Sequence, residues 1–131
     1  MEDKIMKIFI NQLIGKNIKT NDDWKKMVKK GRKLANINLD KIVEIPMSLQ
    51  GLKACKVLSG EGIKVNITSI SYSAQALLAA RAGADYISPV IENIKGVDTV
   101  KEISEMFKRE KIKTKILFEK NEMPLDTGNY A

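Results

Sequence analysis

Residues 41–90 read KIVEIPMSLQGLKACKVLSGEGIKVNITSISYSAQALLAARAGADYISPV, and this stretch decides the fold. Its apolar, β-branched runs at 42–47, 64–70 and 85–90 are typical of buried strands. Helical patterns separate these runs, and each ends in glycine, where a helix is expected to stop. The stretch therefore predicts strand, helix, strand, helix, strand, an order typical of parallel strands joined by helical crossovers.

Similar patterns flank this stretch on both sides. Apolar runs at 7–14 and 114–119 predict two more strands. Helices are predicted before the quoted stretch, capped by Thr20 or Asn21, and again over about 99–109. Because no linker or low-complexity tract interrupts this order, the whole chain of 131 residues is predicted to form one α/β domain of about five parallel strands.

The predicted strand at 64–70 alternates in polarity. Val65 and Ile67 fall on one side of it, and Asn66 and Thr68 fall on the other. In a barrel, the aliphatic pair packs against the surrounding helices and the polar pair points inward. The helix that follows the strand at 42–47 is predicted to be capped by Ser48.

The composition excludes several kinds of site. The chain has one cysteine, Cys55, and no histidine. Internal disulfides, cysteine-built metal sites and histidine-based acid–base catalysis are therefore excluded, and neither a metal nor a cofactor is expected. Cys55 falls among apolar positions of a predicted helix, which indicates a buried, inert thiol. The sequence shows neither a signal-peptide pattern nor a run of membrane-spanning length, which predicts a cytoplasmic protein without membrane contact.

A formal net charge of +7 raises the question of a polyanionic partner. Of the 23 basic residues, three are arginines, Arg32, Arg81 and Arg109. Specific nucleic-acid readout favours arginine and stacking aromatics, and aromatic residues make up only 5% of this chain. The sequence thus argues against nucleic-acid binding, although a basic polyanion-binding protein stays an alternative. Five lysines interleave with apolar residues at helical spacing, which indicates a solvated helix face: Lys25, Lys26, Lys29, Lys30 and Lys33.

The residues from Ile45 to Val90 resemble the transaldolase and fructose-6-phosphate aldolase family. The resemblance is carried by IPMSLQGLKACKVLSGEGIKVNIT and by QALLAARAGADYISP, and it extends with less similarity from about Ile8 to Pro124. It implies a (β/α)8 barrel of the TIM type, in which the strands predicted here correspond to strands three to seven. The expected fold class is therefore a partial TIM-type barrel built from parallel βα repeats.

The resemblance also implies roles for individual residues. The family forms its Schiff base on a lysine that directly precedes an Ile-Pro pair, and this chain has Glu44 at that position. Asn66 and Thr68 match an Asn-x-Thr that holds the substrate and the catalytic water, and Gln12 matches a residue that shares this water. Ser88 matches the serine of a Ser-Pro-Phe motif. Because a carboxylate cannot condense with a carbonyl, Glu44 makes an imine unavailable at its position.

Other residues that bind the substrate in the family are also replaced in this chain. Val90 replaces the phenylalanine of Ser-Pro-Phe, and Glu92 and Asn93 stand where a glycine and an arginine bind the substrate phosphate. Lys120 and Glu122 replace the serine and arginine of another phosphate-binding motif. The family's acid–base aspartate lies on the first barrel strand, which has no counterpart here. Arginine binds phosphate through paired donors, whereas carboxylates repel it, so weak binding of sugar phosphates is expected.

The leading interpretation is a transaldolase-like protein, related to sugar-phosphate metabolism, that lacks Schiff-base aldolase activity. Its expected ligand is a sugar-phosphate-like small molecule. The alternative is an active aldehyde lyase or transaldolase that acts on sugar phosphates through another lysine, such as Lys120, or through a neighbouring subunit.

About five strands cannot close a barrel, and they leave two sheet edges with unpaired backbone groups. Homo-oligomerisation through these edges is expected, because symmetric self-association is the commonest way in which proteins assemble. A separate chain that supplies the missing strands is the alternative.

Overall fold

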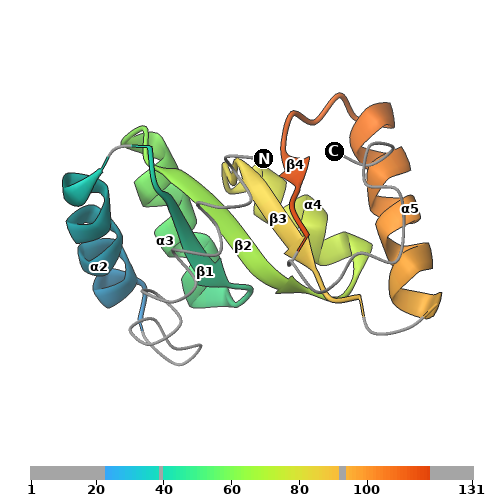
Figure 1. The fold of residues 1–131 in the computed structure, drawn as a ribbon, viewed down its shortest axis with the longest axis horizontal. Helices are drawn as coiled ribbons and strands as arrows, with labels where there is room; N and C mark the ends of the chain where they lie inside the picture. Colours follow the sequence, from blue (N-terminus) through green and yellow to red (C-terminus); the bar gives the residue numbers. More distant parts are fainter. Residues whose placement is uncertain (1–22, 39, 92–93, 119–131) are drawn as a thin grey trace.

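A computed structural model describes residues 23–38, 40–91 and 94–118 of the chain. Helices and strands alternate through these residues, as the sequence predicted (Figure 1). In chain order the elements are α2 (Trp24–Ile37), β1 (Ile42–Pro46), α3 (Leu49–Gly60), β2 (Lys64–Ile70), α4 (Ser73–Arg81), β3 (Tyr86–Pro89), α5 (Ile94–Arg109) and β4 (Lys115–Ile116).

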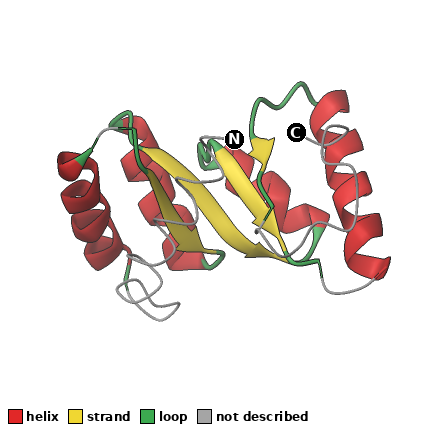
Figure 2. Ribbon diagram, in the orientation of Figure 1, coloured by secondary structure: helices red, strands yellow, loops and turns green. Residues whose placement is uncertain are grey.

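The four described strands form one parallel sheet whose order, β1-β2-β3-β4, is also their order in the chain. A single helix makes each crossover. Right-handed crossovers that always step in the same direction place every connecting helix on the same side of a sheet. Figure 2 shows α3 and α4 behind the strands, with α2 and α5 at the two sides. This arrangement is that of a section of a TIM-barrel wall, which confirms the predicted partial α/β barrel fold.

A row of isoleucines crosses the helix-facing side of the sheet. Ile45, Ile67, Ile87 and Ile116 occupy matched positions of the four strands, and none is more than 3% exposed. A Cβ atom built on Gly51 of α3 would lie 2.9 Å from Cγ2 of Ile45, so this side of the sheet faces the helices. Side chains of α3, α4 and α5 complete the core, among them Ala54, Leu58, Ala76, Ala79, Val100, Ile103 and Phe107.

The start of α2 differs from the prediction. The cap is Asp23, whose carboxylate accepts a hydrogen bond from the backbone N–H of Lys26 at 2.9 Å. The prediction of Thr20 or Asn21 as the cap is therefore wrong, because Asp23 already supplies the acceptor one residue before the helix. Thr20 and Asn21 lie outside the described residues, as does the predicted strand at 7–14.

The last helix and strand also have different bounds from those predicted. The predicted start of α5 at Thr99 is wrong, since the helix begins at Ile94. Thr99 lies inside the helix, where its hydroxyl donates to the carbonyl oxygen of Lys95 at 3.0 Å, a bond that a helix interior permits. The last strand is shorter than the predicted run at 114–119 and covers Lys115–Ile116.

Cys55 is fully buried in α3, as predicted, and burial raises the pKa of its thiol to about 12, with a smaller contribution from the negative charge of Asp85. An exposed thiol in the unfolded chain ionises near its ordinary value of 9.0. Cys55 therefore stabilises the fold in full below about pH 9, and this stabilisation is lost as the pH rises toward 12.

We expect urea unfolding between pH 8 and pH 10.5 to show a steeper fall in the free energy of unfolding for the native chain than for Cys55→Ala. Lysine titration affects both proteins alike, so the difference in slope isolates the thiol. Equal slopes would contradict a thiol that stays protonated in the folded state.

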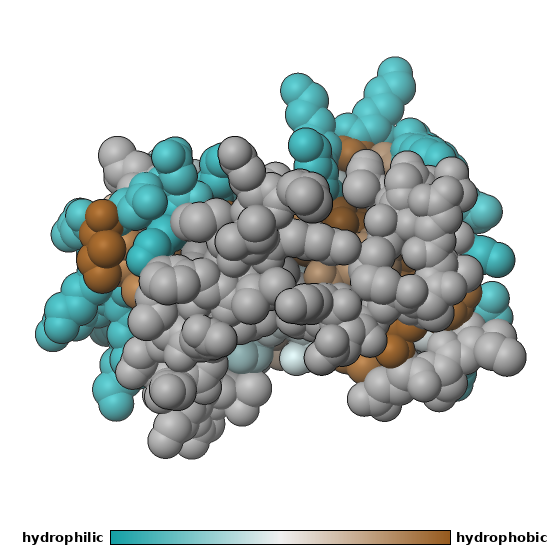
Figure 3. All heavy atoms as spheres, viewed as in Figure 1, coloured by the Kyte–Doolittle hydropathy of each residue, from teal (hydrophilic) through white to brown (hydrophobic). Residues whose placement is uncertain are grey.

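Among the described helices, none combines the length and the apolar character needed to cross a membrane. Figure 3 shows hydrophilic side chains along the margin of the molecule where Figure 1 places α2. The cytoplasmic localisation stays a prediction.

Candidate functional site

A polar row crosses the sheet on the side opposite the helices. Glu44, Asn66, Tyr86 and Lys115 occupy matched positions of β1, β2, β3 and β4, each one residue before the isoleucine row. Successive side chains of a strand point to opposite faces, so this row points away from the helices. In a closed barrel this face is the interior. The alternation predicted for β2 is therefore confirmed and extends across the described sheet.

Three of the predicted site residues meet in this row and directly beside it. The Asn66 amide nitrogen donates to Oγ of Ser88 at 3.0 Å and to Oε2 of Glu44 at 3.4 Å. The Ser88 hydroxyl lies 3.2 Å from the Asn66 carbonyl oxygen, to which it donates. Exposed fractions are 3% for Glu44, 0% for Asn66 and 4% for Ser88, so the cluster is buried. Asn66 links the residues of the two neighbouring strands.

Of the other two predicted residues, only Thr68 lies within the described part of the chain. Thr68 is half-buried and lies two residues beyond Asn66 on the same face, but no described hydrogen bond joins its side chain to the cluster. Its backbone carbonyl accepts from the N–H of Met47 at 2.9 Å. Gln12 lies outside the described residues, and so do Glu92, Asn93, Lys120 and Glu122.

A bulge directly after Thr68 was not predicted. Ser69 has a φ of 62°, and the pairing of β2 with β3 shifts register between Ile67 and Ile70. A non-glycine residue with positive φ in a strand is uncommon, and such bulges often redirect side chains beside functional sites. The bulge lies at the carboxyl end of β2, which belongs to the end of the sheet that carries catalytic residues in TIM barrels. We call this end the mouth.

The start of α3 fixes the mouth end of β1. Ser48 caps this helix, as predicted, and its hydroxyl accepts from the N–H of Gly51 at 2.9 Å. A Cβ atom on Gly51 would lie 2.5 Å from the carbonyl oxygen of Pro46, so only glycine lets the helix approach the strand this closely. This close contact holds the end of the strand that carries Glu44.

The cluster offers a carboxyl group, an amide and a hydroxyl, but no amine. The described strands contain two lysines, Lys64 and Lys115. Lys64 is the exposed first residue of β2, and Lys115 lies in the polar row three strands from Glu44, or about 14 Å at the usual strand spacing. The cluster can bind hydroxyl groups or exchange protons, but it does not itself supply the nucleophile of an imine.

The lysines of α2 lie on its outer surface. Lys25, Lys26, Lys29 and Lys33 are exposed, which confirms the predicted solvated face, whereas Lys30 is half-buried. The neighbouring Arg32 forms an ion pair with Glu61 at the end of α3, with 2.9 Å between Nε and Oε1. The Arg32 guanidinium holds the pKa of the exposed Glu61 carboxyl below its usual value.

Comparison with known proteins agrees with the sequence resemblance. The family described as Transaldolase/Fructose-6-phosphate aldolase matches this chain over residues 17–123. A probable transaldolase of Clostridium botulinum is 46% identical over 100 residues, which cover 72% of this chain and 46% of the relative. A probable transaldolase of Lachnoclostridium phytofermentans is 45% identical over 103 residues, which cover 75% of this chain and 48% of the relative.

The matched region is thus most of this chain but spans about half the length of the curated relatives. It includes the described strands and the buried cluster of Glu44, Asn66 and Ser88. The chain therefore belongs to the transaldolase/fructose-6-phosphate aldolase family.

Proposed function

We propose that this transaldolase-family chain has lost Schiff-base chemistry at β1 and binds a sugar-like ligand without cleaving it. The observation that carries the proposal is the buried carboxyl group of Glu44 on β1, which accepts a hydrogen bond from Asn66 of β2 at 3.4 Å. The family resemblance places the imine-forming lysine at this position. A carboxylate cannot act as the amine in that reaction.

The polar groups of the cluster support a hydroxyl-rich ligand. Glu44 supplies acceptors, Asn66 supplies both a donor and an acceptor, and Ser88 can do either. Such groups suit the hydroxyls of a sugar. The replacement of the family's phosphate-binding arginines by Asn93 and Glu122 argues that the sugar part, more than the phosphate, would be recognised at the mouth.

Reduction with borohydride tests the proposal directly, because it converts any imine between a lysine and a ketose into a stable adduct. We expect the intact mass of the native chain to stay unchanged after incubation with fructose 6-phosphate or dihydroxyacetone and borohydride. A transaldolase of established activity serves as the positive control under the same conditions. An adduct on any lysine, including Lys115 or Lys120, would overturn the proposal and favour an active lyase or transaldolase.

The variant Glu44→Lys gives a second test, because it places an amine at the family's Schiff-base position. We expect little or no aldolase turnover from it, since the described cluster beside position 44, Asn66 and Ser88, offers an amide and a hydroxyl but no acid–base group that titrates near neutral pH. Circular dichroism establishes whether the variant is folded. Substantial turnover would mean that another group of this chain serves as the acid–base catalyst.

We also propose that the chain self-associates. Within the described residues, β1 pairs with β2 alone and β4 pairs with β3 alone, so each has one edge without a described neighbour. A sheet edge that lacks a neighbouring strand favours pairing with another chain. Sedimentation velocity at micromolar concentration is expected to show a dimer or a larger assembly, and a well-folded monomer would contradict this.

A further inference from the structure

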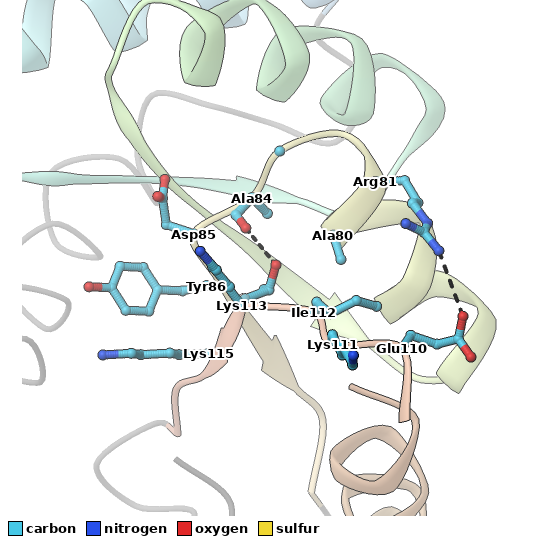
Figure 4. A pocket seen from close by; sticks show the side chains of 12 residues that line it. Ala80, Arg81, Ala84, Asp85, Tyr86, Glu110, Lys111, Ile112, Lys113 and Lys115 are labelled. Atoms are coloured by element: carbon cyan, nitrogen blue, oxygen red, sulfur yellow. Dashed lines mark hydrogen bonds and ion pairs between the residues drawn. The ribbon is translucent and has the colours of Figure 1, made fainter. Parts of the chain in front are cut away.

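A cavity of about 410 Å³ lies at the end of the sheet opposite the mouth. It is formed where α4 turns into β3 and where α5 leads into β4, so its lining comes from the amino ends of these two strands (Figure 4). None of Glu44, Asn66 and Ser88 lines it. The charged residues of its lining are Arg81, Asp85, Glu110, Lys111, Lys113 and Lys115.

The two acidic residues of the lining already have partners. One carboxylate oxygen of Asp85 accepts from the N–H of Val65 at 3.1 Å. The Glu110 carboxylate lies 3.9 Å from Nη2 of Arg81 and 3.6 Å from Nε of Arg109. With four basic and two acidic side chains in its lining, the cavity holds an excess of positive charge.

Three of the four basic side chains are the exposed lysines Lys111, Lys113 and Lys115. Within the described residues, none of the three forms an ion pair. Figure 3 shows long hydrophilic side chains projecting above the segment between α5 and β4, where Figure 1 places these lysines' part of the chain. Like charges gathered on one short segment repel one another, and an anion that binds among them relieves this repulsion.

Stabilisation of helix ends does not account for Lys113 and Lys115. Cations in the last turn of a helix interact favourably with its carbonyl groups, and Arg81, Lys108 and Arg109 occupy such positions in α4 and α5. Lys113 and Lys115 lie beyond the last turn, in the segment that leads into and forms β4.

Lys111 adds a second observation. Its φ is 56°, in the left-handed region where glycine is the usual residue after a helix, and the neighbouring Ile112 N–H bonds to the carbonyl of Phe107 at 2.9 Å. A residue with a side chain costs about 1 kcal/mol in this conformation. A lysine thus occupies a position where glycine would stabilise the turn.

The rest of the lining suits an organic ligand. Ala80, Ala84 and Ile112 contribute apolar surface, and Figure 4 shows the Tyr86 ring and the Lys115 side chain lying side by side. The volume is several times that of a single water molecule, whose share of liquid volume is about 30 Å³. We propose that this cavity binds a small phosphorylated organic molecule. The lysines would neutralise its phosphate, and its carbon skeleton would pack against the apolar surface.

Isothermal titration of the full chain with fructose 6-phosphate, adenosine monophosphate and inorganic phosphate tests this inference. We expect saturable binding of at least one organic phosphate, tighter than that of inorganic phosphate. The double variant Lys113→Gln/Lys115→Gln should weaken it about tenfold or more, as expected for lost charge-assisted contacts. The matched control, Lys29→Gln/Lys33→Gln, removes the same charge from the exposed face of α2 and should change affinity less than about twofold.

Three results would overturn the inference: no saturable binding, equal weakening by both double variants, or inorganic phosphate binding as tightly as the organic compounds. Amide chemical shifts of the native chain provide a test that does not depend on variants. The changes in chemical shift on adding ligand should concentrate at residues 80–86 and 110–115. Shifts concentrated at the mouth instead would also overturn it. Shifts at 80–86 and 110–115 report this cavity, whereas shifts at Asn66 and Ser88 report the cluster of the proposed function, so the two outcomes are distinguished.

Discussion

Placing a second carboxyl group beside Glu44, by Asn66→Asp, is expected to lower the free energy of unfolding at pH 7 by about 3 kcal/mol or more. Asn66 is fully buried, and its amide nitrogen donates to both Glu44 and Ser88. The substitution removes these donors and sets two carboxylates against each other in a buried site. Like charges at this distance cannot both stay ionised without a large cost.

The same variant should regain part of its stability as the pH falls toward 4, because protonation of one carboxyl removes the repulsion. Urea unfolding at pH 4, 5 and 7 measures this. Asn36→Asp, on the exposed side of α2, is the matched control and should change stability by less than about 0.5 kcal/mol. A loss below about 1 kcal/mol for Asn66→Asp, or a loss independent of pH, would contradict the buried contact with Glu44.

Gly51→Ala is expected to destabilise the fold by about 2 to 3 kcal/mol, although alanine is the better helix former. The new Cβ atom would lie 2.5 Å from the Pro46 carbonyl oxygen and 2.9 Å from Cγ2 of Ile45. The strand end and the helix start must therefore separate. Because this contact holds β1 near Glu44, the variant should also loosen the mouth.

Gly60→Ala, in the same helix, is the control for this prediction. A Cβ atom there meets nothing within 4 Å, and Gly60 does not have the positive φ that Gly62 and Gly83 adopt. Alanine should therefore stabilise the fold by about 0.5 to 1 kcal/mol. The two identical substitutions are thus expected to differ in sign, as measured by thermal unfolding. Equal effects would falsify the close contact between α3 and β1.

Much of the fold could be predicted because hydrophobic periodicity depends on local sequence. The alternation around Asn66 gave the two faces of β2, and the same parity in β1 and β3 placed Glu44 and Ser88 on the inner face. Which of these side chains meet depends on strand register, and no single segment encodes register. The hydrogen bonds of Asn66 to both neighbours therefore had to come from the structure.

Two features carry no local signal. Ser69 and Lys111 adopt positive φ values where glycine would ordinarily mark the position, so neither the bulge after Thr68 nor the left-handed turn after α5 could be located from turn residues. The cavity at the amino ends of β3 and β4 was also missed. Arg81 and Lys111 lie far apart in the chain, and only parallel pairing of the two strands brings their turns together.

The agreement between strand order in the sheet and strand order in the chain also bears on how the polypeptide acquires its shape. Contacts between nearby segments form faster than contacts that must close long loops. During synthesis, each new strand and helix can add to the surface left by the preceding pair as it emerges from the ribosome. Folding of the described part can therefore proceed vectorially, from the amino-terminal unit onward.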